Sequence, residues 1–203
     1  MGRYIFCDVE TGGLDPKVHG ITEIGAVAFD FDPQHPNVVK NTGEFQALIA
    51  PNPDLAYTPY ALQLQDRTLA YLTHDGVDEL YAWAQFETFL RKHAADWRGL
   101  GDHIVAHQAS FDYAFLSALA SRCGNSAAFP VTDRCAWICT KNLFRTLSGL
   151  GIVAFRGCGL GDIMRWYGIE IKGKQHNALV DCRAGVEVFR HEVSDLKRYY
   201  GST

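Results

Sequence analysis

Two carboxylates separated by one residue, Asp8 and Glu10, follow a short apolar run near the N-terminus. Side chains two apart on a strand project from the same face, so Asp8 and Glu10 are expected to lie side by side. Adjacent carboxylates repel each other unless a cation lies between them, and Mg²⁺ and Mn²⁺ are hard ions that suit such oxygen ligands. The pair therefore indicates a divalent metal site, and the plain alternative is a solvated pair at the end of a strand.

Two further carboxylates fall in the first turns of predicted helices. Asp112 lies in a helix predicted over 111–122, for which Ser110 is a suitable N-cap. Asp181 lies in the first turn of the final helix, predicted over 177–192. A helix N-terminus favours a carboxylate by ~0.3–1 kcal/mol, which is a sufficient ordinary reason for either residue. For Asp112 the position after a strand adds a functional reason, because sites form at the carboxyl ends of strands.

One histidine, His176, lies five residues before Asp181 and directly after the loop Gly173-Lys174-Gln175. From a loop its ring could reach a water molecule near Asp181, and an ordinary histidine pKa of about 6.5 suits a general base near neutral pH. The alternative is a surface histidine. Lys172 and Lys174 could attract phosphates there, or could simply form a solvated loop.

Hydrophobic periodicity predicts the elements that must position these residues. Apolar runs predict strands over 3–9, 21–31 and 43–49, and the short connections between them indicate an antiparallel meander. The other predicted elements are strands over 103–107 and 130–133, one or two short helices over 59–72, and helices over 77–93, 111–122, 135–147, 160–167 and 177–192. A meander continued by β-α units predicts an α/β protein with a mixed five-stranded sheet and helices on both faces.

The composition bounds the class of protein. The 203 residues fit one domain, with a core from about residue 3 to 190, and 47% hydrophobic and 21% charged residues are ordinary for a soluble protein. A net charge of −4 argues against a general nucleic-acid coat protein. The N-terminus is unlike a signal peptide and no run of about 18 apolar residues occurs, so we expect a cytoplasmic protein with no membrane segment. Six cysteines without a Cys-x-x-Cys pair fit thiols of a reducing compartment.

Three segments, in the order FCDVETGGL, AHQASFDYAFL and HNALVDCRAGVEVF, resemble the motifs of the DEDDh exonucleases. This DnaQ-like family has a ribonuclease H-like fold and includes epsilon-type proofreading subunits, ribonuclease T, oligoribonuclease and exodeoxyribonuclease X-like enzymes. The resemblance also accounts for Glu23 to Val27 in the second strand and for Asp133. A histidine at 176, rather than a tyrosine nearer Asp181, selects the branch with a histidine base.

The resemblance implies a 3′→5′ exonuclease that releases nucleoside 5′-monophosphates from single-stranded or frayed ends. Two Mg²⁺ ions, for which Mn²⁺ can substitute, would be held by Asp8, Glu10, Asp112 and Asp181, with His176 as general base. DNA is the favoured substrate, and an exoribonuclease of the same family is the alternative.

The resemblance also implies which residues contact the substrate. Thr11 and Gly12 correspond to positions near the 3′-hydroxyl, and Leu14 to a position against the last base. Gln108 stands where the family often has Asn. Because Gln is longer by one methylene group, contacts with the substrate strand at this position could differ from those in the family. Phe111 and Phe115 resemble base-stacking positions, although core packing is the commoner role for both.

Two rival interpretations remain open at this point. Asp8-Val9-Glu10-Thr11 is similar to the nucleophile motif of haloacid dehalogenase-like phosphohydrolases, but Asp is expected there at position 10. The second rival is an exonuclease-like fold that only binds nucleic acid. The expected partner is a single-stranded 3′ end, and a homodimer or a polymerase-associated complex is left open.

Overall fold

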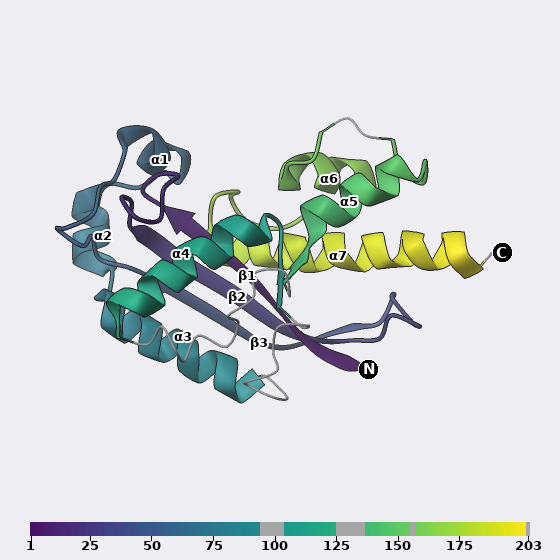
Figure 1. The fold of residues 1–203 in the computed structure, drawn as a ribbon, viewed down its shortest axis with the longest axis horizontal. Coiled ribbons are helices and arrows are strands. Elements are labelled where there is room, and N and C mark those ends of the chain that lie inside the picture. The colour runs from purple at the N-terminus through teal and green to yellow at the C-terminus, as the bar shows by residue number, and fades with distance from the viewer. Residues whose placement is uncertain (94–103, 125–136, 155–156, 202–203) are drawn as a thin grey trace.

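A mixed sheet with helices on both faces forms the centre of the protein (Figure 1). The computed structural model describes residues 1–93, 104–124, 137–154 and 157–201. The predicted α/β architecture is confirmed, and it matches a ribonuclease H-like fold.

The five strands have the order β3-β2-β1-β4-β5, so that β1 is central. Strands β1 (Gly2–Thr11), β2 (Ile21–Phe31) and β3 (Val39–Leu48) form the predicted antiparallel meander. The two short strands β4 (Ile104–Ala106) and β5 (Ile138–Cys139) continue the sheet in parallel with β1.

Two layers of helices cover the sheet. The described helices are α1 (Pro59–Leu64), α2 (Leu69–Asp75), α3 (Glu79–His93), α4 (Ala109–Arg122), α5 (Thr140–Gly149), α6 (Leu160–Tyr167) and α7 (Ala178–Gly201). Helices α3 and α4 bury their apolar sides against one face of the sheet, and α7 buries its apolar side against the other. Helices α5 and α6 form a smaller core with α7. None of the described helices combines the length and the apolar character that crossing a membrane requires.

The alternation of side chains along β1 assigns its residues to these two layers. Ile5, Cys7 and Val9 belong to the core beneath α3 and α4, whereas Phe6 belongs to the core beneath α7. Helix α7 lies close to the sheet because Gly185 has no side chain, since a Cβ atom there would lie 2.0 Å from the Phe6 ring. The even-numbered residues of β1 therefore face α7.

Several predicted boundaries were wrong. Helix α4 begins two residues early, with Gln108 rather than Ser110 at the N-cap, because the Phe111 N–H already donates to the Gln108 carbonyl oxygen at 2.7 Å. Helix α5 begins at Thr140 rather than 135, because Ile138 and Cys139 extend the sheet as β5.

Other boundaries differ less or are not described. Helix α7 continues to Gly201, beyond the predicted end at 192. The predicted strand over 130–133 lies outside the described residues.

Candidate active site

The carboxylates of Asp8 and Glu10 lie at the carboxyl end of the central strand. Asp8 is opposite Gly25 and Glu10 is opposite Glu23 in the antiparallel register with β2. Because Val9 between them is buried in the core on the other face, both carboxylates project from the same face, as predicted. That face is the one covered by α7.

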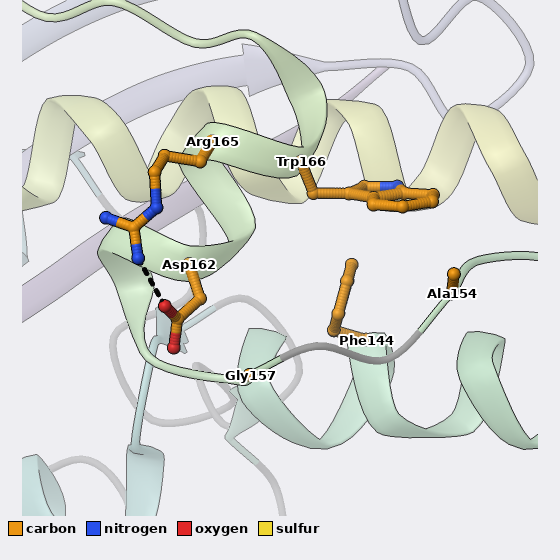
Figure 2. Close-up of a pocket in the computed structure, with 6 residues that line it drawn as sticks. All are labelled: Phe144, Ala154, Gly157, Asp162, Arg165 and Trp166. Atoms are coloured by element: carbon orange, nitrogen blue, oxygen red, sulfur yellow. Dashed lines mark hydrogen bonds and ion pairs between the residues drawn. The ribbon is translucent and has the colours of Figure 1, made fainter.

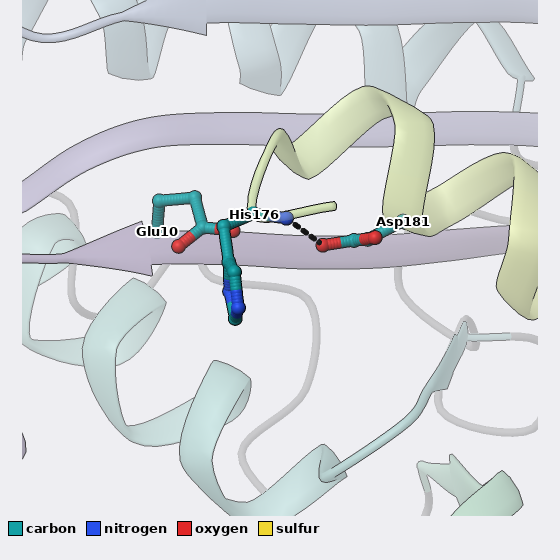
Figure 3. A group of neighbouring side chains, drawn as sticks. All are labelled: Glu10, His176 and Asp181. Atoms are coloured by element: carbon teal, nitrogen blue, oxygen red, sulfur yellow. Dashed lines mark hydrogen bonds between the residues drawn. The ribbon is translucent and has the colours of Figure 1, made fainter. Parts of the chain in front are cut away.

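Helix α7 brings the second part of the site to the same place (Figure 3). Ligand atoms of Glu10, His176 and Asp181 all lie within 4.8 Å of one another. The His176 backbone N–H donates to the Asp181 Oδ2 atom at 3.0 Å. His176 has a left-handed backbone conformation, with φ of 63°, which reverses the chain just before α7 and leaves the imidazole exposed. The predicted loop position of the histidine, beside Asp181, is therefore what the structure shows.

The fourth carboxylate, Asp112, comes from the first turn of α4 and is 3% exposed. Its Oδ1 atom accepts a hydrogen bond of 3.2 Å from the backbone N–H of Val9, which lies between Asp8 and Glu10 in the chain. A side chain from the opposite helical layer thus reaches the end of β1.

Burial disfavours the ionised forms of all four carboxylates, and at Asp8 and Glu10 the charges of neighbouring carboxylates add to this effect. Burial, and after it the charges of Asp181 and Glu23, raise the pKa of Glu10 to about 8. Burial likewise raises the pKa of Asp112 to about 7 and that of Asp181 to about 6. The pKa of Asp8 is raised well above its ordinary value by burial and then by Asp112, Glu10 and Asp181.

This arrangement has the chemistry of a divalent cation site. Four carboxylates on three elements are costly to keep ionised together in the absence of a counter-charge. A hard divalent cation supplies that charge and prefers oxygen ligands. The donor set therefore fits Mg²⁺ or Mn²⁺.

A hollow of about 620 Å³ adjoins the carboxylates. It is lined by Val9, Glu10, Thr11, Gly13, Leu14, His19, Thr58, Tyr60, Ala61, Leu64, Gln65, Phe111 and His176. Three of the predicted substrate residues, Thr11, Leu14 and Phe111, are among them. Its wall is mostly apolar, and the large side chains of Leu14 and Tyr60 are 85% and 71% exposed. Such a surface suits nucleobases, which stack on aromatic and apolar side chains.

The other three predicted substrate residues are placed differently. Phe115 is 1% exposed and packs in the core, so this prediction was wrong: its ring cannot reach a bound strand. Gly12 is buried beneath Tyr57, where a Cβ atom would lie 2.6 Å from the ring, so it shapes the turn rather than the wall of the hollow. Gln108 is exposed, and its Oε1 atom accepts a hydrogen bond of 2.7 Å from Lys141.

Sequence reasoning did not identify the residues that α1 contributes to the hollow. Thr58 caps this helix and Pro59 begins it, so a helix was predictable. Which side of the helix faces the site was not, because Tyr60, Ala61 and Leu64 form no motif. Long-range contacts fix it instead: Gln65 donates to the Thr11 carbonyl oxygen at 2.8 Å and accepts from the Thr22 hydroxyl at 2.6 Å.

A second hollow, of about 290 Å³, lies between α5 and α6, and the residues that line it are not those of the carboxylate site (Figure 2). Its one acidic lining residue, Asp162, is already paired with Arg165 at 2.5 Å and accepts from the Gly159 N–H at 3.1 Å. The other described residues that line this hollow, Phe144, Ala154, Gly157, Arg165 and Trp166, carry no carboxylate. This hollow therefore lacks the ligand chemistry of the site on β1.

Comparison with known proteins agrees with this geometry. A family model described as "Exonuclease" matches residues 5–189. The chain belongs to this exonuclease family. Membership makes it a nuclease hydrolase of a metal-dependent family, so the dehalogenase-like and binding-only alternatives are set aside.

Curated relatives and solved structures place the exonuclease in context. It is 26% identical to ribonuclease T from Enterobacter sp. (strain 638), over 97% of this chain and 84% of that protein. It is 29% identical to a PolC-type DNA polymerase III from Staphylococcus aureus (strain bovine RF122 / ET3-1), over 96% of this chain but only 12% of that protein. Escherichia coli exonuclease I in complex with a dT13 oligonucleotide has the same fold, with a TM-score of 0.79 at 15% identity. That match covers 100% of this chain and 43% of the other.

Proposed function

We propose that the exonuclease removes nucleoside 5′-monophosphates one at a time from single-stranded or frayed 3′ ends, with DNA favoured over RNA. The observation that carries this proposal is the convergence of Asp8, Glu10, Asp112, Asp181 and His176 beside an apolar hollow. An exoribonuclease is the second candidate, because ribonuclease T is among the relatives.

Two Mg²⁺ ions, replaceable by Mn²⁺, would be held by Asp8, Glu10, Asp112 and Asp181. When bound, such ions stabilise the charge that develops on the attacking and leaving oxygens of a phosphodiester. The raised pKa values of Glu10, Asp112 and Asp181 support this assignment, since a cation would restore the ionised forms.

His176 would act as general base. Its imidazole is exposed on the rim of the hollow, and its ligand atoms lie within 4.8 Å of those of Glu10 and Asp181. The hydrogen bond from its own backbone N–H to Asp181 keeps the loop in place. A ring nitrogen would take the proton of the attacking water, a role that typically contributes 10²–10⁴-fold in rate.

The apolar wall would hold the last nucleotides. Leu14, Tyr60 and Phe111 offer exposed or half-buried surfaces against which bases can stack. The Thr11 hydroxyl donates to the Gly13 carbonyl oxygen at 2.6 Å and so shapes the turn that carries Leu14. Base stacking of this kind is tolerant of sequence, which suits an enzyme that shortens any strand.

The expected partner is therefore a single-stranded 3′ end. Two of the exonuclease I structures that share this fold contain the oligonucleotides dT13 and dA16, and the PolC relative is a polymerase. A freestanding enzyme, a homodimer and a polymerase-associated complex remain the three arrangements to be distinguished by size measurements with and without a polymerase.

The first experiment is a nuclease assay on 5′-labelled single-stranded DNA and RNA of identical sequence, with Mg²⁺, Mn²⁺ or EDTA. We expect a ladder that shortens from the 3′ end, requires metal and is absent from Asp8→Ala. The DNA-to-RNA rate ratio decides between the two candidates. Absence of shortening on both polymers, in the presence of metal, would overturn the proposal.

A further inference from the structure

Glu23 is a buried charge that the proposed chemistry does not use. It lies on β2 opposite Glu10 and is 0% exposed. Its Oε1 atom accepts hydrogen bonds from Gln46 at 2.5 Å and from the Asn177 side chain at 3.1 Å. Its Oε2 atom accepts from Arg67 at 2.7 Å and from the Ala178 backbone N–H at 3.0 Å. Four donors from three separate segments therefore meet on one carboxylate.

Two of those donors belong to the start of α7. The first backbone N–H groups of a helix have no partner within the helix, and Glu23 satisfies that of Ala178. Asn177 satisfies that of Val180 through its Oδ1 atom at 3.1 Å. The approach depends on Gly25, since a Cβ atom there would lie 2.3 Å from the Ala178 carbonyl carbon. The sheet thus fixes the turn that carries Asp181.

A third donor links this turn to the substrate hollow. The Arg67 side chain is 9% exposed and follows α1, which forms one wall of the hollow. The preceding residue, Asp66, pairs with Lys174 at 2.8 Å on the surface. Asp66 and Arg67, the second and third residues after α1, are therefore both linked to the segment that carries His176. Asp66 binds Lys174 before His176 directly at the surface. Arg67 is linked to Asn177 after it through the buried Glu23.

Stability alone is a poor reason for this buried pair. Burying two charges carries a desolvation cost that their attraction often fails to offset. The charge of Glu23 also adds to the repulsion at the site, because it raises the pKa values of Asp8, Glu10 and Asp181. A role in holding the segment of His176 and Asp181 in position would account for the presence of a buried ion pair that is costly to desolvate and that adds repulsion to the site.

We propose that Glu23, together with Arg67, is a positioning residue that aligns His176 and Asp181 with Glu10. This inference rests on the proposed function for its catalytic meaning, although the alignment of the metal ligands can be tested without it. Partners of this outer kind typically contribute 10–100-fold in metal affinity or activity.

The test compares Glu23→Gln with the matched control Glu44→Gln in the full chain. Glu44 also joins the sheet to α7, through Arg183, but this pair is exposed, and the described hydrogen-bond partners of Glu44 are Asn41 and Arg183. The readouts are thermal unfolding, the Kd for Mn²⁺ alone, and kcat and KM on a 5′-labelled oligonucleotide.

We expect Glu23→Gln to weaken Mn²⁺ binding and to lower kcat by about 10-fold or more, with KM changed by less than about threefold. Glu44→Gln should have the Mn²⁺ affinity and the kcat of the wild type. A folded Glu23→Gln protein with wild-type Mn²⁺ affinity and kcat would overturn the inference.

A second pair of variants covers a failure of Glu23→Gln to fold. Asn177→Ala and Arg67→Met each remove one donor from Glu23, and each should shift Mn²⁺ affinity in the same direction by a smaller factor. Wild-type affinity in both would also overturn the inference. If the wild type binds Mn²⁺ but degrades neither DNA nor RNA, the proposed function fails, and the Mn²⁺ comparison still decides the positioning role.

Discussion

The His176 backbone N–H donates to the carboxylate of Asp181 at 3.0 Å, so the candidate base and a candidate metal ligand share one turn of the chain. Moving either residue moves the other. The exposed imidazole nevertheless remains free to turn toward a water molecule, because only the backbone of His176 is used in this contact.

Because the backbone of His176 makes the contact with Asp181 and the ring does not, the effect of His176→Ala can be predicted. The substitution removes the ring and keeps the backbone contact, so kcat should fall by about 10²–10⁴-fold while Mn²⁺ affinity changes far less. His35→Ala is the matched control, because His35 is an exposed histidine paired with Asp32 far along the sheet. Single-turnover rates on labelled single-stranded DNA measure the difference. Equal losses in the two variants would show that His176 is not the base.

The crowded carboxylates predict how stability depends on pH. The folded pKa values of Asp181, Asp112 and Glu10, about 6, 7 and 8, lie above their ordinary values of 3.8, 3.8 and 4.5. The folded state therefore binds more protons than the unfolded state between about pH 4 and pH 8. In EDTA the free energy of unfolding should fall as the pH rises through this window, and Mn²⁺ should restore it most at pH 8. Urea titrations at pH 5, 6.5 and 8 test this, and stability that rises with pH in EDTA would contradict it.

Asp8→Asn separates activity from stability. Asp8 interacts unfavourably with four neighbouring carboxylates, so the neutral amide should make the metal-free protein more stable at pH 8 while it abolishes hydrolysis. For a chain of this size each kcal/mol corresponds to a rise of about 2–4 °C in Tm. Thermal unfolding in EDTA gives the comparison. A lower Tm in EDTA at pH 8 would mean that repulsion does not dominate at Asp8.

Two phenylalanines on α4 should differ in their effects. Phe111 lines the hollow and Phe115 lies in the core, one turn further along. Phe111→Ala should raise KM, since loss of base stacking costs about 1–3 kcal/mol per base. Phe115→Ala should instead lower the free energy of unfolding by about 3–5 kcal/mol. Steady-state kinetics beside urea unfolding separates the two, and a KM effect of Phe115→Ala without loss of stability would restore the prediction made from the sequence.

Gly25→Ala tests how closely α7 must approach β2. The added methyl group meets the backbone of Ala178 and Leu179 at 2.3–2.6 Å, so the helix start must move. We expect destabilisation of about 1–3 kcal/mol and a fall in kcat. Gly149→Ala at the end of α5 is the control, because no described atom outside its chain neighbours and its own helix backbone would lie within 4 Å of the added methyl group. Wild-type stability and activity in Gly25→Ala would show that the gap tolerates a side chain.

The sequence predicted the parts of this site better than their surroundings. Strand alternation was enough to place Asp8 and Glu10 on one face, and the turn residues before α7 were enough to place His176 beside Asp181. Each of these is a local relationship, fixed within a few residues of backbone.

What the sequence could not provide depends on distant contacts. The apolar residues of α4 gave no way to tell the buried ring of Phe115 from the accessible ring of Phe111. The short strand β5 forms because β4 offers an edge to Ile138 and Cys139, which alone resemble the start of a helix. The place of α1 beside the hollow is set by hydrogen bonds from Gln65 to residues 43 and 54 positions away.

The junction between Glu23 and α7 also has a consequence for the order of synthesis. Its hydrogen bonds join residues 154 and 155 positions apart, so the loop that they close spans most of the chain. Translation delivers Asp8, Glu10 and Asp112 long before His176 and Asp181, and long-range closure of this kind is slow relative to local folding. A growing polypeptide therefore carries the first three carboxylates without Asp181 and without the proposed base, and we expect no nuclease activity until α7 has been made and docked.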